Sequence, residues 1–191
     1  MTDLDRTLDF LNGIGFSLTA EHGVNGFLDG GGVLIRDGAL VYDPDRALVS
    51  DLLHEAAHIA IMPPRWRPLL QRDVDGAIEI MFNEMAPIDL HPDHPLSRAA
   101  MQCSDPEATS WAWAAGHAIG LAPEVVILDW QYEGEGSTER LRLLPSLSAV
   151  RRVTGHMGIH GLAYAGFCSL REGGVLPMYP RMRIWMQDAD I

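Results

Sequence analysis

A run of mostly apolar residues, marked by proline at both ends, constrains this chain more than any other feature. Asp43-Pro44-Asp45 precedes residues 46–62, and Pro63-Pro64 follows them. Aspartate at an N-cap and proline at the first helical position favour a helix start, whereas interior proline ends a helix. We therefore predict a helix from Asp43-Pro44 to about Met62. Because most of its side chains are apolar, we expect it to be buried.

Shorter patterns predict the rest of the fold. Leu4, Leu8 and Leu11 have helical spacing, and the Asp-Gly pair between residues 33–35 and 40–42 is typical of a hairpin. The further segments are expected to be a strand at 16–20, helices at 72–86 and 107–121, an irregular stretch at 87–98, a strand or extended segment at 125–132, and a long helical stretch at 146–170. The prediction is one α+β domain over residues 1–191, with a small N-terminal antiparallel sheet packed on a mainly helical body.

Charge and composition exclude several classes of protein. The formal net charge is −12, and all 14 basic residues are arginines, so no Schiff-base lysine or phosphate-loop lysine exists. We expect no nucleic-acid partner. No apolar run reaches the ~18–20 residues of a membrane span, and the acidic start is unlike a signal peptide. Only Cys103 and Cys168 are present, which favours buried free thiols and a reducing, cytoplasmic location.

The buried helix contains the sequence His54-Glu55-Ala56-Ala57-His58, an H-E-x-x-H pattern. Two histidines four residues apart project from one helical face, which lets both imidazoles reach one zinc ion. Glu55 points beside that ion, where it can accept a proton from water activated by the metal and return it to a leaving amine. Since ionisable groups in an apolar helix are costly without partners, we interpret the pattern as a metal site rather than a coincidence.

A catalytic zinc ion needs a third protein ligand. We expect Glu107, because it begins a predicted helix and leads the stripe formed by positions 107, 111, 114 and 118. Ser104 to Glu107 also fits a capping box, in which Glu107 would only close its own helix. The other candidate ligands are Glu84, His117, His160 and the loop pair His91 and His94.

The predicted C-terminal helical stretch carries a polar stripe of Arg152, His156, His160 and Tyr164. His160 and Tyr164 are candidates for stabilising an oxyanion, although a polar stripe is also typical of an exposed helix face. Its glycines indicate close packing against another helix, for which the helix over residues 43–62 is the candidate. We expect Trp111, Trp113 and Trp130 in the core.

The hairpin, the Asp-Pro helix start, the segment Leu53 to Ala60 and the later helix beginning with Glu107 together resemble the zincin metallopeptidases. Within them the chain is most similar to the gluzincin-like group, which includes short bacterial proteases that cleave repressors, or to an uncharacterised bacterial branch. The resemblance covers about residues 30–120. It implies a zincin-like fold, Zn²⁺ held by His54, His58 and Glu107, and Glu55 as catalytic acid/base.

Two functional hypotheses follow. The first is a zinc-dependent hydrolase, most simply a metallopeptidase acting on a peptide or protein. The second is a non-catalytic acidic interaction protein, in which the metal site is vestigial or structural. A cleft over His54 favours the first, whereas a clustered acidic face without such a cleft favours the second. The sequence predicts neither the substrate nor the oligomeric state.

Overall fold

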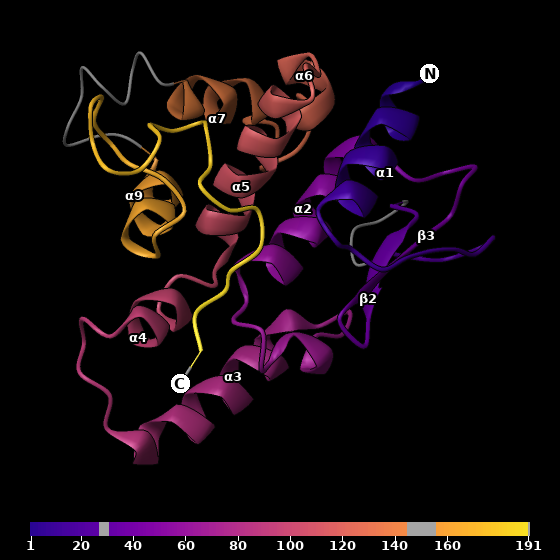
Figure 1. Cartoon of the computed structure of the whole chain (residues 1–191). Helices are drawn as coiled ribbons and strands as arrows, with labels where there is room; N and C mark the ends of the chain where they lie inside the picture. The colour runs from indigo at the N-terminus through magenta and orange to yellow at the C-terminus, as the bar shows by residue number, and fades with distance from the viewer. Residues whose placement is uncertain (27–30, 145–155, 191) are drawn as a thin grey trace.

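The structure, a computed structural model, describes residues 1–26, 31–144 and 156–190 (Figure 1). Short strands near the N-terminus are followed by a series of helices, which confirms the predicted α+β class. Along the chain the elements are α1 (Asp3–Gly13), β1 (Leu18–Ala20), β2 (Val33–Arg36), β3 (Ala39–Tyr42), α2 (Val49–Ile61), η1 (Arg67–Leu69), α3 (Val74–Met85), η2 (Ala86–Ile88), α4 (Pro95–Ala100), α5 (Asp105–Ala118), α6 (Pro123–Val126), α7 (Gly136–Leu143) and α9 (Met157–Tyr164).

The predicted hairpin is present, but the sheet is mixed rather than antiparallel. β2 and β3 pair antiparallel through a turn at Asp37 and Gly38, whose φ angles of 51° and 71° are the positive values that a tight hairpin turn requires. β1 pairs with the other edge of β3 and runs parallel to it. The strand order within the described residues is β1-β3-β2, so β3, the second strand of the hairpin, lies between β1 and β2.

Helix α2 ends where the prolines predict, but it begins at Val49 and not at Asp43. The carboxylate of Asp43 accepts hydrogen bonds from the backbone N–H groups of Gly23 at 2.8 Å and Asp45 at 3.0 Å. Its backbone carbonyl accepts a third from Ala47 at 2.8 Å. These bonds hold the Asp-Pro segment in a turn after β3, which delays the start of the helix.

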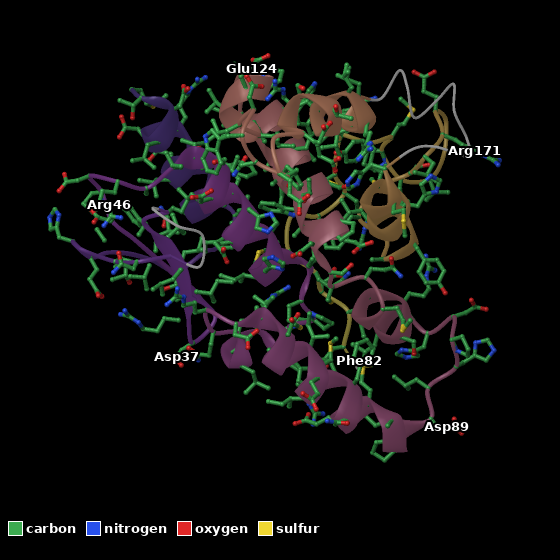
Figure 2. The ribbon with its side chains drawn as sticks, turned by 180° about the vertical axis from the view of Figure 1, so that it is seen from behind. Asp37, Arg46, Phe82, Asp89, Glu124 and Arg171 are labelled. Carbon is green, nitrogen blue, oxygen red and sulfur yellow. The ribbon has the colours of Figure 1, made fainter. Side chains whose placement is uncertain are left out.

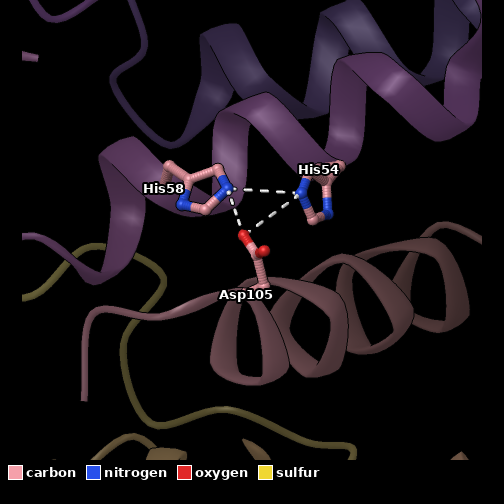
Figure 3. A group of neighbouring side chains, drawn as sticks. All are labelled: His54, His58 and Asp105. Carbon is pink, nitrogen blue, oxygen red and sulfur yellow. Dashed lines mark hydrogen bonds and ion pairs between the residues drawn. The ribbon is translucent and has the colours of Figure 1, made fainter. Parts of the chain in front are cut away.

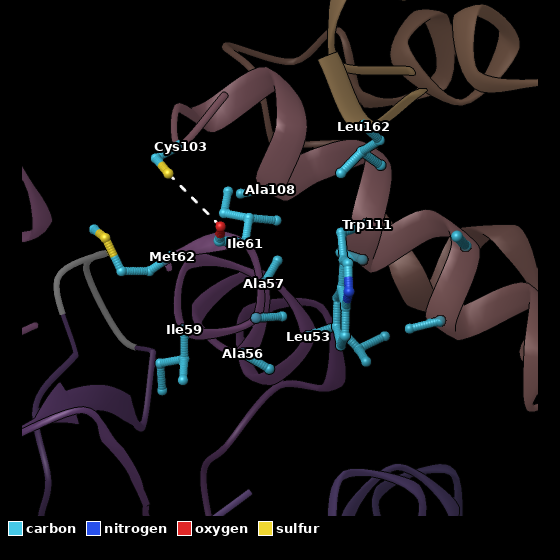
Figure 4. Close-up of a cluster of buried hydrophobic side chains, with 14 of the residues drawn as sticks. Leu53, Ala56, Ala57, Ile59, Ile61, Met62, Cys103, Ala108, Trp111 and Leu162 are labelled. Atoms are coloured by element: carbon cyan, nitrogen blue, oxygen red, sulfur yellow. Dashed lines mark hydrogen bonds between the residues drawn. The ribbon is translucent and has the colours of Figure 1, made fainter. Parts of the chain in front are cut away.

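Helix α2 packs along α5, and the two helices share the hydrophobic core (Figure 4). Leu53 and Ala57 of α2 are fully buried, as are Ala108 and Trp111 of α5. The small alanine side chains let the helices approach closely, and burying Trp111 removes a large apolar surface from water. Trp113 is also buried, as predicted, but Trp130 is 58% exposed, so its assignment to the core is wrong.

Helix α9 packs against α5 rather than against α2. A Cβ atom at Gly158 would lie 1.7 Å from the carbonyl oxygen of Pro106, and one at Gly161 would lie 2.1 Å from Oε1 of Glu107. The predicted close packing is therefore present, with α5 as the partner helix. Residues 145–155, which include Arg152 and part of the predicted long helix, lie outside the described residues.

Two connecting segments differ from expectation. Residues 87–98 were expected to be irregular, but His94 caps the short helix α4 through its ring nitrogen and Pro95 occupies the first position. Residues 125–132 were expected to be extended, but Pro123 starts α6 and the chain then turns. In both segments proline starts a short helix, because its fixed φ suits the first helical turn.

The C-terminal segment after α9 crosses both central helices (Figure 1). Trp111 of α5 donates from its indole N–H to the carbonyl of Trp185 at 3.0 Å. The backbone N–H of Gln187 donates to Ala60 of α2 at 2.8 Å. Arg67 donates to Ile59 at 3.0 Å and also to Gln187. These bonds tie the segment to α2 and α5.

Both cysteines are buried and unpaired, as predicted, and burial raises the pKa of each thiol to about 12. Cys103 donates weakly to the carbonyl of Ile61 at the end of α2, at 3.7 Å (Figure 4). None of the helices in the described ranges is both long and apolar enough to span a bilayer.

Candidate metal centre

Three side chains from two helices meet at one point (Figure 3). His54 and His58 project from successive turns of α2, and Asp105 reaches them from the first turn of α5. The Nε2 atoms of the two histidines lie 3.2 Å apart. Oδ1 of Asp105 lies 3.3 Å from Nε2 of His58 and 3.9 Å from Nε2 of His54.

These separations fit one small, tetrahedrally coordinated ion. Ligand atoms bonded at about 2.0–2.1 Å to a tetrahedral zinc ion lie about 3.3–3.4 Å from one another. Two of the three separations match within 0.2 Å and the third is longer. The three residues can therefore provide one face of a coordination shell, with a further position open.

The surroundings favour the metal-binding protonation states of the ligands. Burial and the neighbouring His58 lower the pKa of His54, which favours its neutral imidazole. The hydrogen bond with His58 lowers the pKa of Asp105, which favours its carboxylate. Neutral imidazole and ionised carboxylate are the forms that bind metals. His58 is buried, whereas the side chain of Asp105 is 78% exposed, so the group is open to solvent on the Asp105 side.

Glu55 lies next to this group without belonging to it. It lines a cavity of about 320 Å³ together with His54, His58 and Asp105. Burial raises the pKa of Glu55 to about 7. Glu55 therefore lines the same space as the two imidazoles and lies outside the histidine-aspartate cluster.

Cavities lie on both sides of the centre and share two of its residues. The cavity at Glu55 is closed on its other side by Arg72, Asp73, Val74 and Asp75, from the start of α3 and the segment before it. A second cavity, of about 370 Å³, is lined by His54 and Asp105 together with residues of α5, α6 and the segment 127–133. A molecule bound across the centre can therefore extend in two directions.

The structure does not bring Glu107 to the centre. Its side chain is buried against α9 beside Gly161, and it accepts a hydrogen bond from the hydroxyl of Ser104. The carboxylate at this helix start that does reach the histidines is that of Asp105, two positions earlier. Ser104 is the N-cap residue, but its side chain caps no backbone N–H group and meets Glu107 only side chain to side chain, so the capping box is not formed.

The other candidate ligands also lie elsewhere in the described structure. Glu84 accepts from the indole of Trp66 at 3.0 Å and pairs with Arg65 at 3.1 Å. His91 bonds to the backbone of Asp93, and His94 caps α4. His117, His160 and Tyr164 are exposed, and Tyr164 lies under the guanidinium of Arg98.

A second group within the described residues could also hold an ion, formed by His22, Asp43 and Asp45. His22 and Asp45 are exposed, with His22 Nδ1 3.0 Å from Oδ2 of Asp45. Both oxygens of Asp43 already accept backbone hydrogen bonds. The group has no glutamate in the position that Glu55 occupies beside the first, so His54, His58 and Asp105 form the stronger candidate metal centre.

Comparisons with protein-family models, with curated proteins and with solved structures found no match to this chain.

Proposed function

We propose that this protein is a zinc-dependent hydrolase, most simply a metallopeptidase, built on His54, His58 and Asp105 with Glu55 as general base. One observation carries the proposal: two imidazoles and a carboxylate converge, two of their three separations match a tetrahedral ion, and Glu55 lines the cavity beside them. Two imidazole ligands favour zinc over magnesium or calcium. Asp105 replaces Glu107 as the third ligand in this proposal.

Zinc held by such a set supplies Lewis-acid chemistry, polarising a carbonyl group and making a water molecule more acidic. The chain itself supplies the proton transfers. Glu55 accepts the proton of the attacking water, because it lines the same cavity as His54, His58 and Asp105. The same carboxyl then returns the proton to the departing amine.

Cavities on both sides of the centre support a hydrolase over a non-catalytic interaction protein. An inert or structural metal site is normally closed by four protein ligands. Here Asp105 is mostly exposed, and His54 lines both cavities. A substrate carbonyl can approach such a centre.

The test is a comparison of the zinc-loaded wild type with Glu55→Gln on an unbiased peptide library read by mass spectrometry. We expect about one zinc ion per chain in both proteins and cleavage by the wild type only. The variant should lose at least the ~10²–10⁴-fold that a positioned acid/base contributes. Glu124→Gln, on the exposed end of α6, is the matched control and should cleave like the wild type.

Equal cleavage by Glu55→Gln would show that another group is the base. A zinc-loaded wild type that cleaves no peptide in the library would overturn the peptidase assignment.

A further inference from the structure

We propose that the cavity formed by α5, α6 and the segment 127–133 is a subsite for a large apolar side chain next to the bond that is cleaved. This inference rests on the proposed peptidase function. The cavity has a volume of about 370 Å³ and is lined by His54 and Asp105, so a side chain inside it belongs to a residue held at the metal centre.

The walls of this cavity are mainly apolar. Ala112 of α5 and Val126 of α6 line it together with Ile127, and the aromatic rings of Trp130 and Tyr132 stand beside them. Trp130 is 58% exposed and Tyr132 is 40% exposed. Large aromatic side chains left partly in water beside a cavity are typical of binding surfaces, because a ligand that covers them gains their burial.

Three of the polar side chains that line the cavity, those of Thr109, Gln131 and Tyr132, already have hydrogen-bond partners within the protein. The hydroxyl groups of Thr109 and Tyr132 lie 2.8 Å apart. Gln131 accepts from the backbone N–H of Leu128 at 2.8 Å and donates to Asp51 at 3.2 Å. Because these groups already have partners, the wall that they form does not require a polar ligand.

The segment that carries the aromatic rings is held in one shape. Tyr132 and Glu133 have φ angles of 56° and 59°, a conformation that costs energy for residues other than glycine. Arg140 donates to the carbonyl of Ile127 at 2.5 Å, and Gly136 packs so tightly on Leu128 that a Cβ atom there would lie 2.0 Å from its carbonyl oxygen. A preformed wall binds a side chain with little further ordering.

The cavity on the other side of the centre differs in chemistry. Glu55, Arg72, Asp73 and Asp75 line it, whereas Glu133 is the one carboxylate besides the shared Asp105 that lines the cavity at Trp130. Charged walls are poor partners for an apolar group. The two cavities therefore favour different side chains, and we expect the large apolar side chain to bind in the cavity at Trp130.

The direct test measures binding without cleavage. N-acetyl-leucinamide and N-acetyl-asparaginamide have side chains of similar shape but opposite polarity. Each is titrated into the zinc-loaded protein while the indole N–H signal of Trp130 is followed by NMR, with Trp130→Ala to assign that signal. We expect the leucine probe to bind at least tenfold more tightly than the asparagine probe.

Two variants test the location of the subsite. Ala112→Leu fills the cavity and should remove the preference for the leucine probe. Trp130→Ala changes only an exposed side chain, so it should fold, and it should weaken the leucine probe as measured by calorimetry. Leu141→Ala, at a 55% exposed position on α7, is the control and should leave both affinities unchanged.

Equal affinity for the two probes would overturn the subsite. Binding that leaves the indole N–H signal of Trp130 unshifted would overturn it as well. The failures of the two proposals are distinguishable. A leucine preference that depends on Trp130, in a protein that cleaves no peptide, supports the subsite and rejects the peptidase. Cleavage with no preference for large apolar residues on either side of the bond supports the peptidase and rejects the subsite.

Discussion

Asp105 and Glu107 are two positions apart in the first turn of α5, and their side chains lie on opposite sides of that helix. Two helical positions correspond to a rotation of about 200°. Oδ1 of Asp105 accordingly lies 3.3 Å from Nε2 of His58 on α2, whereas Glu107 is buried beside Gly161 of α9. One helix start thus provides a candidate metal ligand on one side and a packing contact on the other.

This relationship predicts which carboxylate holds the metal. Asp105→Asn should weaken zinc binding by at least the ~10–100-fold that even an outer-shell partner contributes. Glu107→Gln should leave zinc affinity unchanged and lower stability by about 1 kcal/mol, because it weakens one hydrogen bond from Ser104. Calorimetric titration of metal-free protein measures the affinities. The His22→Ala variant controls for binding at the second group, and the reverse pattern would restore Glu107 as the ligand.

The contact between α9 and α5 predicts a large effect of one methyl group. Gly158→Ala places a Cβ atom 1.7 Å from the carbonyl oxygen of Pro106, and backbone cannot move aside cheaply. Overpacking of this kind typically costs about 1–3 kcal/mol. Gly76→Ala on α3 is the control, because nothing lies within 4 Å of the new atom, and it should stabilise the protein by about 0.5–1 kcal/mol. Chemical denaturation compares the two, and equal stabilities would contradict the helix contact.

A buried hydrogen-bonded chain predicts acid sensitivity. Glu139 of α7 lies 2.5 Å from Nε2 of His156, whose Nδ1 lies 2.9 Å from the hydroxyl of Ser110 on α5. The bond to His156 lowers the pKa of Glu139, so the stabilisation is complete above the ordinary value of 4.5 and is lost as the pH falls through the folded-state value. Glu139→Gln should cost about 1.5–3 kcal/mol near neutral pH and much less at low pH.

Thermal unfolding across this pH range checks the prediction. Glu124→Gln is the control, since Glu124 stands at the outer end of α6, away from the core (Figure 2). A penalty at Glu139 that does not change with pH would mean that packing, rather than charge, makes the contribution.

The carboxylate of Asp51 on α2 predicts the opposite dependence on pH. Oδ1 accepts from Ser50 and Gln131, but Oδ2 is buried without a partner. Burial raises the pKa of Asp51, so folding favours the protonated form and stability is lost as the pH rises through the folded-state value. Asp51→Asn should therefore be more stable than the wild type near neutral pH, by about 1 kcal/mol or more. The gain should vanish at acidic pH, and a loss at neutral pH would contradict the argument.

Local patterns predicted the elements whose causes are local. The hairpin follows from Asp37-Gly38, and the end of α2 follows from Pro63. The parallel pairing of β1 with β3 depends on how a long segment returns to the sheet, which no short pattern encodes. The predicted start of α2 was wrong, because the carboxylate of Asp43 accepts a hydrogen bond from the backbone of Gly23, a residue 20 positions earlier.

The site was half predictable for the same reason. The spacing of His54, Glu55 and His58 specifies one helical face without any tertiary information. The third carboxylate requires knowing which side of α5 faces α2. Residues 107–116 of α5 are all buried, so no apolar stripe distinguishes one side from another. The sequence places Asp105 at the start of a predicted helix, but nothing in the pattern indicates that its side chain lies on the side of the histidines.

The C-terminal segment, which bonds to α5 through Trp185 and to α2 through Gln187, has a consequence for biosynthesis. Helices α2 and α5 contribute all three candidate ligands, yet both are bonded to residues that leave the ribosome at least 67 positions after the end of α5. A partly synthesised chain has the histidines and the aspartate, but it lacks the bond that Trp111 donates to Trp185 and the bond that Ala60 accepts from Gln187. The bonds that fasten the two ligand-bearing helices to the C-terminal segment are therefore among the last contacts that the growing chain can form.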